Sequence, residues 1–157
     1  MNRSTIRLLA ENYMRLATHE KFVDWAASSL ETGLDTKSIR ILASLQKPLF
    51  PAEVEDYFYR SLKELDWKLP EPIECVIEYA RFFAEEILSG QVSPVEGCRR
   101  IYKVVVFLEY PPELMSWLYL DEGLMPDASR ELTSAELNAA IIKEAQKFAG
   151  EAKEYVS

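Results

Sequence analysis

Apolar residues recur at helical spacing along most of this chain. Between Glu71 and Gly90 they fall every three or four residues and form one stripe. The next segment, about residues 94–109, carries apolar side chains on nearly every side. A helix with one apolar stripe packs on a core, whereas a helix that is apolar all round lies inside it. The pattern therefore predicts two consecutive helices, the second of them central to the fold.

Six further helices are predicted by the same periodicity, and no segment shows the alternation that is typical of a strand. We expect them at residues 5–18, at residues 20–32, after Asp35, after Pro51, at residues 113–120 and after Thr133. The stripe of residues 71–90 should bury Ile73 and Leu88, and the last helix should bury Ala152 and Tyr155.

Several helix ends carry local signals. Gly33 suits the left-handed conformation that closes a helix, and Asp35 suits the N-cap of the helix that follows. In a capping box, a hydroxyl and a carboxylate three residues apart bind each other's backbone N–H groups. Two such boxes are expected, Ser93 with Glu96 and Thr133 with Glu136.

Length and composition agree with an ordinary globular chain. With 157 residues, of which 48% are hydrophobic and 28% charged, the chain is long enough to bury a core without disulfides or metal. We therefore predict an all-α fold of seven or eight helices, in a single domain over residues 1–157.

The net charge and the cysteine content indicate which kinds of partner and which cellular compartment suit the chain. The net charge of −8 argues against a nucleic-acid surface, which needs clustered lysine and arginine, and is compatible with a basic protein partner. The longest strongly apolar run, Val104–Leu108, is far shorter than the roughly 20 residues of a membrane span. Without a secretory signal, a cytoplasmic location with Cys75 and Cys98 as free thiols is expected.

The residues that usually carry catalysis are scarce. His19 is the only histidine, which removes the common imidazole metal sites, and no phosphate-binding glycine loop or nucleophile motif occurs. We place His19 at the junction of the first two helices. The carboxylates of the helices after Pro51 and Glu71 are expected on solvated faces, paired as Asp56 with Arg60 and as Glu78 or Glu85 with Arg81. No catalytic residue, metal or cofactor is predicted.

One cluster of cations occupies an unfavourable place. Arg99, Arg100 and Lys103 lie early in the most apolar helix, where the helix dipole disfavours positive charge. Ion pairing, with Glu96 among the partners, is the first interpretation. An anion-binding site formed with Tyr102 is the second.

Aromatic residues suggest a second candidate surface. Tryptophan and tyrosine are enriched at binding hot spots. Packing of these aromatic residues at the edge of the core is the simpler explanation. If they instead form an exposed interaction surface, the candidate protein-contact residues are Trp67, Trp117, Tyr119, Asp121 and Glu122.

Two segments carry a family resemblance. The run DTKSIRILASL at residues 35–45 and the run EVEDYF at residues 53–58 resemble a family of small, all-helical bacterial proteins of uncharacterised function. The similar order of segments covers most of the chain. The resemblance implies a bacterial, cytoplasmic protein and transfers no catalytic residue.

Three functional hypotheses follow, in order of preference. The first is a non-enzymatic protein-interaction domain of the accessory, regulatory or immunity-protein type, with homo-oligomerisation left open. The second is a helical domain that binds a small anionic ligand near Arg99, Arg100, Tyr102 and Lys103. The third is a carboxylate-dependent enzyme, which requires acidic residues that converge in a concave site.

Overall fold

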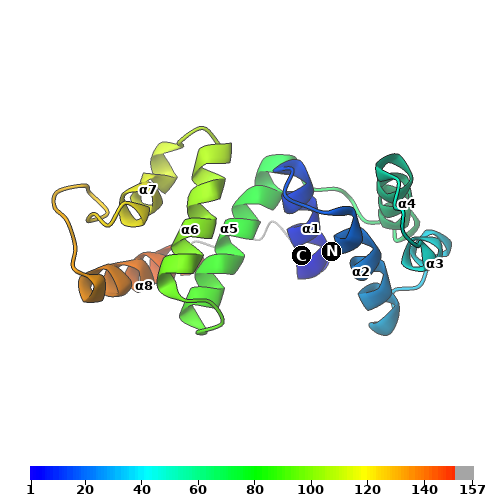
Figure 1. The fold of residues 1–157 in the computed structure, drawn as a ribbon, viewed down its shortest axis with the longest axis horizontal. Helices are drawn as coiled ribbons and strands as arrows, with labels where there is room; N and C mark the ends of the chain where they lie inside the picture. Colours follow the sequence, from blue (N-terminus) through cyan, green and yellow to red (C-terminus); the bar gives the residue numbers. More distant parts are fainter. Residues whose placement is uncertain (151–157) are drawn as a thin grey trace. The chain divides into compact units, whose positions relative to one another are not determined.

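The structure is a computed structural model that describes residues 1–150. Within these residues it contains eight α-helices, one short 3₁₀ turn and no β-strand, which confirms the predicted all-α class (Figure 1). The elements are α1 (Arg3–Tyr13), α2 (His19–Glu31), α3 (Lys37–Ser44), α4 (Pro51–Glu64), α5 (Pro72–Leu88), α6 (Pro94–Phe107), the 3₁₀ turn η1 (Pro112–Leu114), α7 (Met115–Asp121) and α8 (Ser134–Gly150). Ala152 and Tyr155, expected inside the last helix, lie outside the described residues.

The chain divides into two compact units, and α5 begins in the first and continues into the second. The first unit comprises residues 1–75, and the second begins at Val76. Each unit is described by itself below. A single domain over residues 1–157 stays a prediction.

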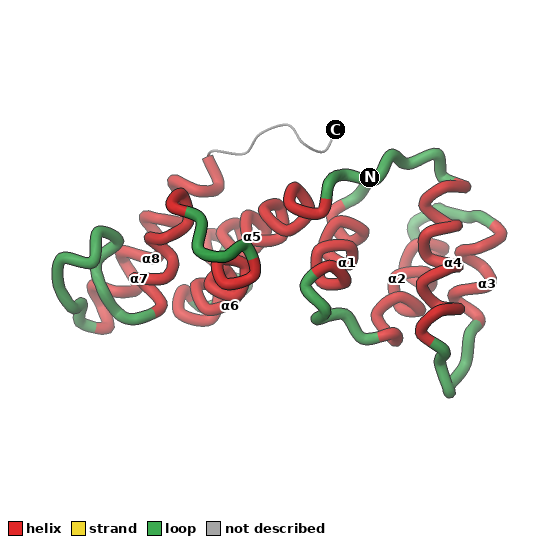
Figure 2. The backbone as a smooth tube through the Cα atoms, turned by 90° about the horizontal axis from the view of Figure 1, so that it is seen from above, coloured by secondary structure: helices red, strands yellow, loops and turns green. Residues whose placement is uncertain are grey.

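In the first unit, α2, α3 and α4 pack against one another and α1 packs against α2 (Figure 2). Phe58 of α4 is fully buried, and its ring meets Phe22 edge to face at 5.0 Å and Trp25 at 4.9 Å between centroids. The buried indole N–H of Trp25 donates to Thr5 Oγ1 at 2.9 Å. The rings join α2 to α4, because edge-to-face aromatic pairs combine large apolar area with favourable electrostatics, and the hydrogen bond of Trp25 adds α1.

A carboxylate from α4 caps α3 from outside its own helix. Glu64 accepts hydrogen bonds from the backbone N–H of Ser38 at 3.0 Å and from its hydroxyl at 2.6 Å. Thr36, rather than the predicted Asp35, is the N-cap, and its hydroxyl oxygen accepts from the N–H of Ile39. Asp35 instead pairs with Arg40 at 2.5 Å. The prediction for Asp35 was wrong because a tertiary carboxylate and the adjacent threonine satisfy the helix start.

In the second unit, α6 packs against both α7 and α8. Gly97 allows α5 to approach α6, because any Cβ at this position would clash with the side chain of Ile87. Trp117, Ile141 and Phe148 complete the core from α7 and α8. At the start of α8, the reciprocal bonds of the predicted capping box between Thr133 and Glu136 are both present at 3.3 Å.

Two expectations about buried faces were wrong. α6 is not buried on every side: Val106 is 40% exposed and Phe107 is 44% exposed. A helix that packs on α7 and α8 along one side leaves its opposite side uncovered. In α5, Ile73 and Leu88 lie at the two ends of the helix and are exposed, although they share its apolar periodicity.

Six helices end in the same backbone motif. In each, a residue with positive φ follows the helix, and the next residue donates its N–H to the carbonyl five positions earlier. This Schellman closure satisfies carbonyls that the helix leaves unpaired. The left-handed residues are Arg15, Gly33, Asp66, Gly90, Glu109 and Gly123, and only half of them are glycines.

We expect Glu109→Gly to stabilise the protein. Glu109 has φ 59°, a conformation that disfavours a side chain by about 1 kcal/mol, and glycine relieves this cost at some expense in unfolded-state entropy. The net gain should be about 0.5 kcal/mol in urea denaturation. The control Lys143→Gly, on the exposed side of α8, should instead cost about 1 kcal/mol. Destabilisation by both variants would contradict the prediction.

We expect Glu64→Gln to lower the free energy of unfolding by about 1 kcal/mol at pH 7. The hydrogen bonds from Ser38 hold the pKa of Glu64 below its usual range. A carboxylate whose pKa is lowered by folding stabilises the protein at neutral pH, and this contribution is lost as the pH falls. The difference between wild type and variant should therefore shrink near pH 3. Glu31→Gln, an exposed carboxylate at the end of α2, should change stability by less than about 0.5 kcal/mol.

Candidate functional site

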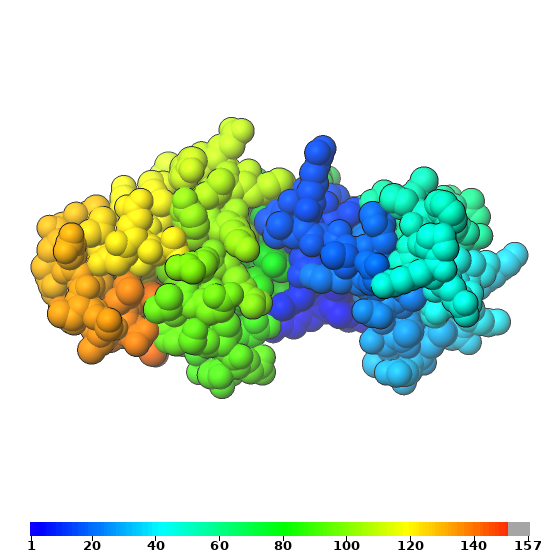
Figure 3. Space-filling model, in the orientation of Figure 1, coloured from blue at the N-terminus to red at the C-terminus, as the bar shows by residue number. Residues whose placement is uncertain are grey.

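α6 has one buried side and one exposed side. The buried residues are Gly97, Cys98, Ile101, Val104 and Val105. At 100° per residue, the exposed positions of the opposite side span about 120° of the helix. This surface, named the α6 face, consists of Val95, Glu96, Arg99, Lys103, Val106 and Phe107, together with Tyr110 just beyond the helix. In the space-filling view, part of α6, coloured yellow-green, lies at the surface (Figure 3).

The end of α6 places Tyr110 beside the helix. Glu109 is left-handed, and the N–H of Tyr110 donates to the carbonyl of Val105 at 2.9 Å. Tyr110 is 49% exposed. Partial burial and a hydrogen-bonding interaction with Tyr110 raise the pKa of Tyr102, which shows that the two hydroxyls are neighbours. The closure therefore brings two tyrosines together at this end of the face.

Arg100 is held by groups of the same unit. Its Nε donates to Glu96 Oε1 at 2.9 Å, and its guanidinium lies over the ring of Phe83 at 5.2 Å. The bond with Arg100 lowers the pKa of Glu96. The Ser93 hydroxyl oxygen accepts a hydrogen bond from the N–H of Glu96, so this half of the predicted capping box between Ser93 and Glu96 is present. Ion pairing, the first interpretation of the cluster, is confirmed for Arg100.

The other two cations are less constrained. Arg99 Nε lies 3.9 Å from Asp121 Oδ1, a long and exposed contact. Within residues 1–150, Lys103 makes no ion pair with a carboxylate. Asp121 and Glu122 also raise the pKa of Tyr102, so they lie near it. The structure thus brings together part of the predicted anion site and part of the predicted contact set.

The remaining predicted contact residues differ in position. Trp117 is 1% exposed, and its ring meets Phe148 at 6.0 Å. It is therefore a core residue and presents no surface to a partner, as the packing interpretation holds. Tyr119 is half-buried on α7, and Trp67 belongs to the first unit.

Sequence analysis missed the apolar part of the α6 face. Val106 and Phe107 were assigned to the core because apolar residues surround the helix, and Tyr110 was not singled out. The helical spacing of the charged residues could have identified these positions. Arg99 and Lys103 mark the side of α6 that faces water, and Val106 and Phe107 fall on that same side of the helix.

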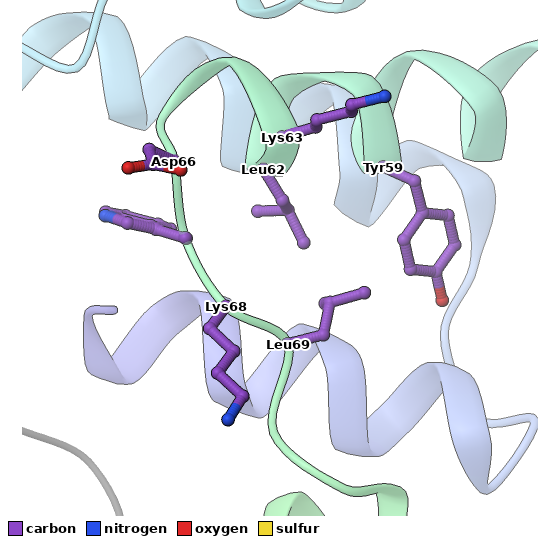
Figure 4. A pocket seen from close by; sticks show the side chains of 7 residues that line it. Tyr59, Leu62, Lys63, Asp66, Lys68 and Leu69 are labelled. Carbon is purple, nitrogen blue, oxygen red and sulfur yellow. The ribbon is translucent and has the colours of Figure 1, made fainter.

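The first unit contains a hollow at the end of α4, with a volume of about 390 Å³. This surface, named the α4 hollow, is lined by Tyr59, Leu62, Lys63, Asp66, Trp67, Lys68 and Leu69. Leu62 and Leu69 point toward each other across it, and the ring of Tyr59 closes one side (Figure 4). Asp66 points away from its centre (Figure 4).

The closure of α4 builds this hollow. Asp66 has φ 54°, and the N–H of Trp67 donates to the carbonyl of Leu62 at 3.0 Å, so the chain turns back under the helix. The hydroxyl oxygen of Tyr59 accepts a bond from Asn12 Nδ2 of α1 at 3.2 Å. Burial raises the pKa of Tyr59, so its phenol is protonated at neutral pH.

Within residues 1–150, no group of three or more histidine, cysteine or acidic side chains could hold a metal ion. His19 starts α2 and stacks on Phe22 at 6.3 Å. Cys75 and Cys98 are buried free thiols, as predicted, and burial raises the pKa of Cys98 to about 12. Cys98 is therefore protonated at neutral pH, which makes it a poor nucleophile.

The pair of Glu78 and Arg81 in α5 is present but buried rather than solvated. Both side chains are almost inaccessible, and the Arg81 guanidinium lies over the ring of Phe148 at 5.5 Å. The Nε of Arg81 has no hydrogen-bond partner within the described residues. The exposed pair of Asp56 and Arg60 matches its prediction at 2.9 Å.

Comparisons with protein-family models, with curated proteins and with solved structures find no significant match to this chain. The resemblance to small bacterial helical proteins therefore stays a prediction. No helix among residues 1–150 combines the length and the apolar character needed to cross a membrane.

Glu78→Gln should lower the free energy of unfolding by about 3 kcal/mol, because it removes the negative charge that is bound to the buried Arg81. Adding Arg81→Met should recover most of this loss. The matched control is Asp56→Asn, which breaks an exposed pair and should cost less than about 0.5 kcal/mol. Equal losses in the two single variants, measured by urea denaturation, would show that burial of the pair has no energetic consequence.

Proposed function

We propose that this chain is a non-enzymatic protein-interaction domain and that the α6 face is its binding surface. The observation that carries the proposal is the exposure of three large apolar side chains beside two cations. Val106, Phe107 and Tyr110 are between 40% and 49% exposed, and Arg99 and Lys103 lie among them. Exposed apolar residues that cluster with polar ones are typical of protein interfaces.

The composition of the α6 face favours an acidic, partly apolar partner segment. The net charge of −8 suggested a basic partner, but a contact is decided by charges within about 10 Å at moderate salt. The charges of this face are those of Glu96, Arg99 and Lys103, and Asp121 lies 3.9 Å from Arg99. Lys103 makes no ion pair with a carboxylate within the described residues, so it is the cation of this face that an acidic group of the partner would meet. Phe107 and Tyr110 would supply the apolar contact. Arg residues and large aromatics are the usual anchors of such interfaces.

The hypothesis of an anion-binding site formed by Arg99, Arg100, Lys103 and Tyr102 has weaker support. Arg100 is already bound to Glu96, and Arg99 faces Asp121, so two of the three cations have carboxylates beside them. A carboxylate-dependent enzyme has the least support, since no potential metal cluster of acidic groups occurs in the described residues. The cytoplasmic location, the bacterial origin and the oligomeric state stay predictions.

Site-specific photo-crosslinking tests this proposal. A photoreactive phenylalanine analogue placed at Phe107 should form a discrete adduct in native lysate, and Lys103→Glu should abolish that adduct. The same analogue at Ile142, an exposed apolar position of α8 in the same unit, is the matched control and should give little product. Charge reversal is preferable to a salt series because the net charge of −8 opposes an acidic partner over longer range.

Two outcomes would contradict the proposal. Equal crosslinking at both positions would mean that the α6 face has no preference for a partner. An adduct that survives Lys103→Glu would show that the cation contributes nothing to recognition. Unchanged thermal unfolding of the variant should accompany either measurement, since Lys103 is exposed.

A further inference from the structure

The α4 hollow has the shape of a ligand site. Its volume of about 390 Å³ falls within the range of small-molecule sites in proteins. Leu62 and Leu69 face each other across it and form an apolar floor, with the ring of Tyr59 at one side (Figure 4). Leu62 is buried, but Leu69 is 43% exposed, so water rather than protein covers much of its side chain. An apolar ligand group would displace that water favourably.

The polar groups of the hollow are mainly hydrogen-bond donors. The oxygen of Tyr59 already accepts a bond from Asn12, which leaves its O–H free to donate. Within residues 1–150, the indole N–H of Trp67 and the exposed ammonium groups of Lys63 and Lys68 make no hydrogen bond or ion pair with a protein group. These groups and the Tyr59 hydroxyl are available to a ligand that brings acceptors.

The lining side chains carry a net positive charge. Two lysines stand against the single carboxylate of Asp66, and all three charged side chains point outward from the centre of the hollow (Figure 4). The backbone N–H groups of Asp66 and Trp67 are occupied by the closure of α4 and bind Lys63 O and Leu62 O. The local field therefore favours an anion whose contacts come from side chains.

We propose that the α4 hollow binds a small amphipathic carboxylate. Its acyl or aromatic body lies on Leu62 and Leu69, and its carboxylate lies at the rim, where Lys63 and Lys68 occupy opposite edges (Figure 4). A charge-assisted hydrogen bond from either ammonium, with the donors of Tyr59 and Trp67 nearby, supplies the recognition. This site lies in the first unit and does not depend on the function proposed for the α6 face.

Calorimetric titration of the full chain with octanoate tests the ligand class. Octanamide, which has the same apolar body without the charge, is the matched ligand. Octanoate should bind saturably and should bind about fivefold more tightly than octanamide, the size expected for one partly exposed ion pair. The intrinsic fluorescence change on binding should disappear in Trp67→Phe, because Trp25 and Trp117 are buried elsewhere.

Charge variants test the site in both directions. Lys63→Gln and Lys68→Gln remove the two cations, and at least one of them should weaken octanoate binding about threefold. Asp66→Asn removes the opposing charge while keeping a residue that tolerates positive φ, and it should tighten binding by a similar factor. Lys143→Gln, an exposed lysine of the second unit, should leave the affinity unchanged.

Three results would overturn the inference. They are the absence of saturable octanoate binding, equal affinities for octanoate and octanamide, and affinities that none of the three charge variants changes. Octanoate should not affect crosslinking at Phe107. A failure of the octanoate experiments would therefore leave the α6 face proposal standing, and a failure of the crosslinking experiment would leave the α4 hollow proposal standing.

Discussion

The closure of helix ends by left-handed residues is the constraint on which much of this structure depends. A helix leaves its last carbonyls unpaired, and here six helices satisfy some of them through the N–H groups of the left-handed residue and of the residue after it. The closure also reverses the direction of the chain and brings the residue after the left-handed one back beside the helix. Short connections between α1 and α2, or between α5 and α6, become possible because the turn is built into the helix end.

The same closure sets the position of both candidate surfaces. Trp67 is the third residue after α4, and Tyr110 is the third residue after α6. Each aromatic side chain is thereby anchored by its own backbone bond to the preceding helix. Asp66 and Glu109 adopt positive φ at these two places although they are not glycines, so these two turns retain local strain.

Tertiary partners replace local ones at several polar positions. Glu64 closes the start of α3 across a separation of 26 residues, where the sequence favoured Asp35. Glu96 binds Arg100 in preference to completing its capping box. Glu78 and Arg81 have the predicted spacing. Because both side chains are buried, with Arg81 over the ring of Phe148, the loss of one partner should lower the free energy of unfolding more than the spacing alone indicates. Each polar group has several acceptable partners in sequence, and packing selects one.

Sequence alone determined the helical class, the order of the helices and much of the core, because 3.6-residue periodicity and capping residues are local properties. It placed the end of the first helix at residue 18, whereas α1 ends at Tyr13. It also identified Arg99, Lys103 and Trp67 as residues to examine. It could not decide which side of α6 is uncovered, because apolar residues such as Phe107 and Ile101 occur on both sides and differ only in what packs against them. It assigned Trp117 to the surface set and missed the α4 hollow for the same reason. Exposure depends on neighbours distant in sequence, and only the tertiary structure brings those neighbours together.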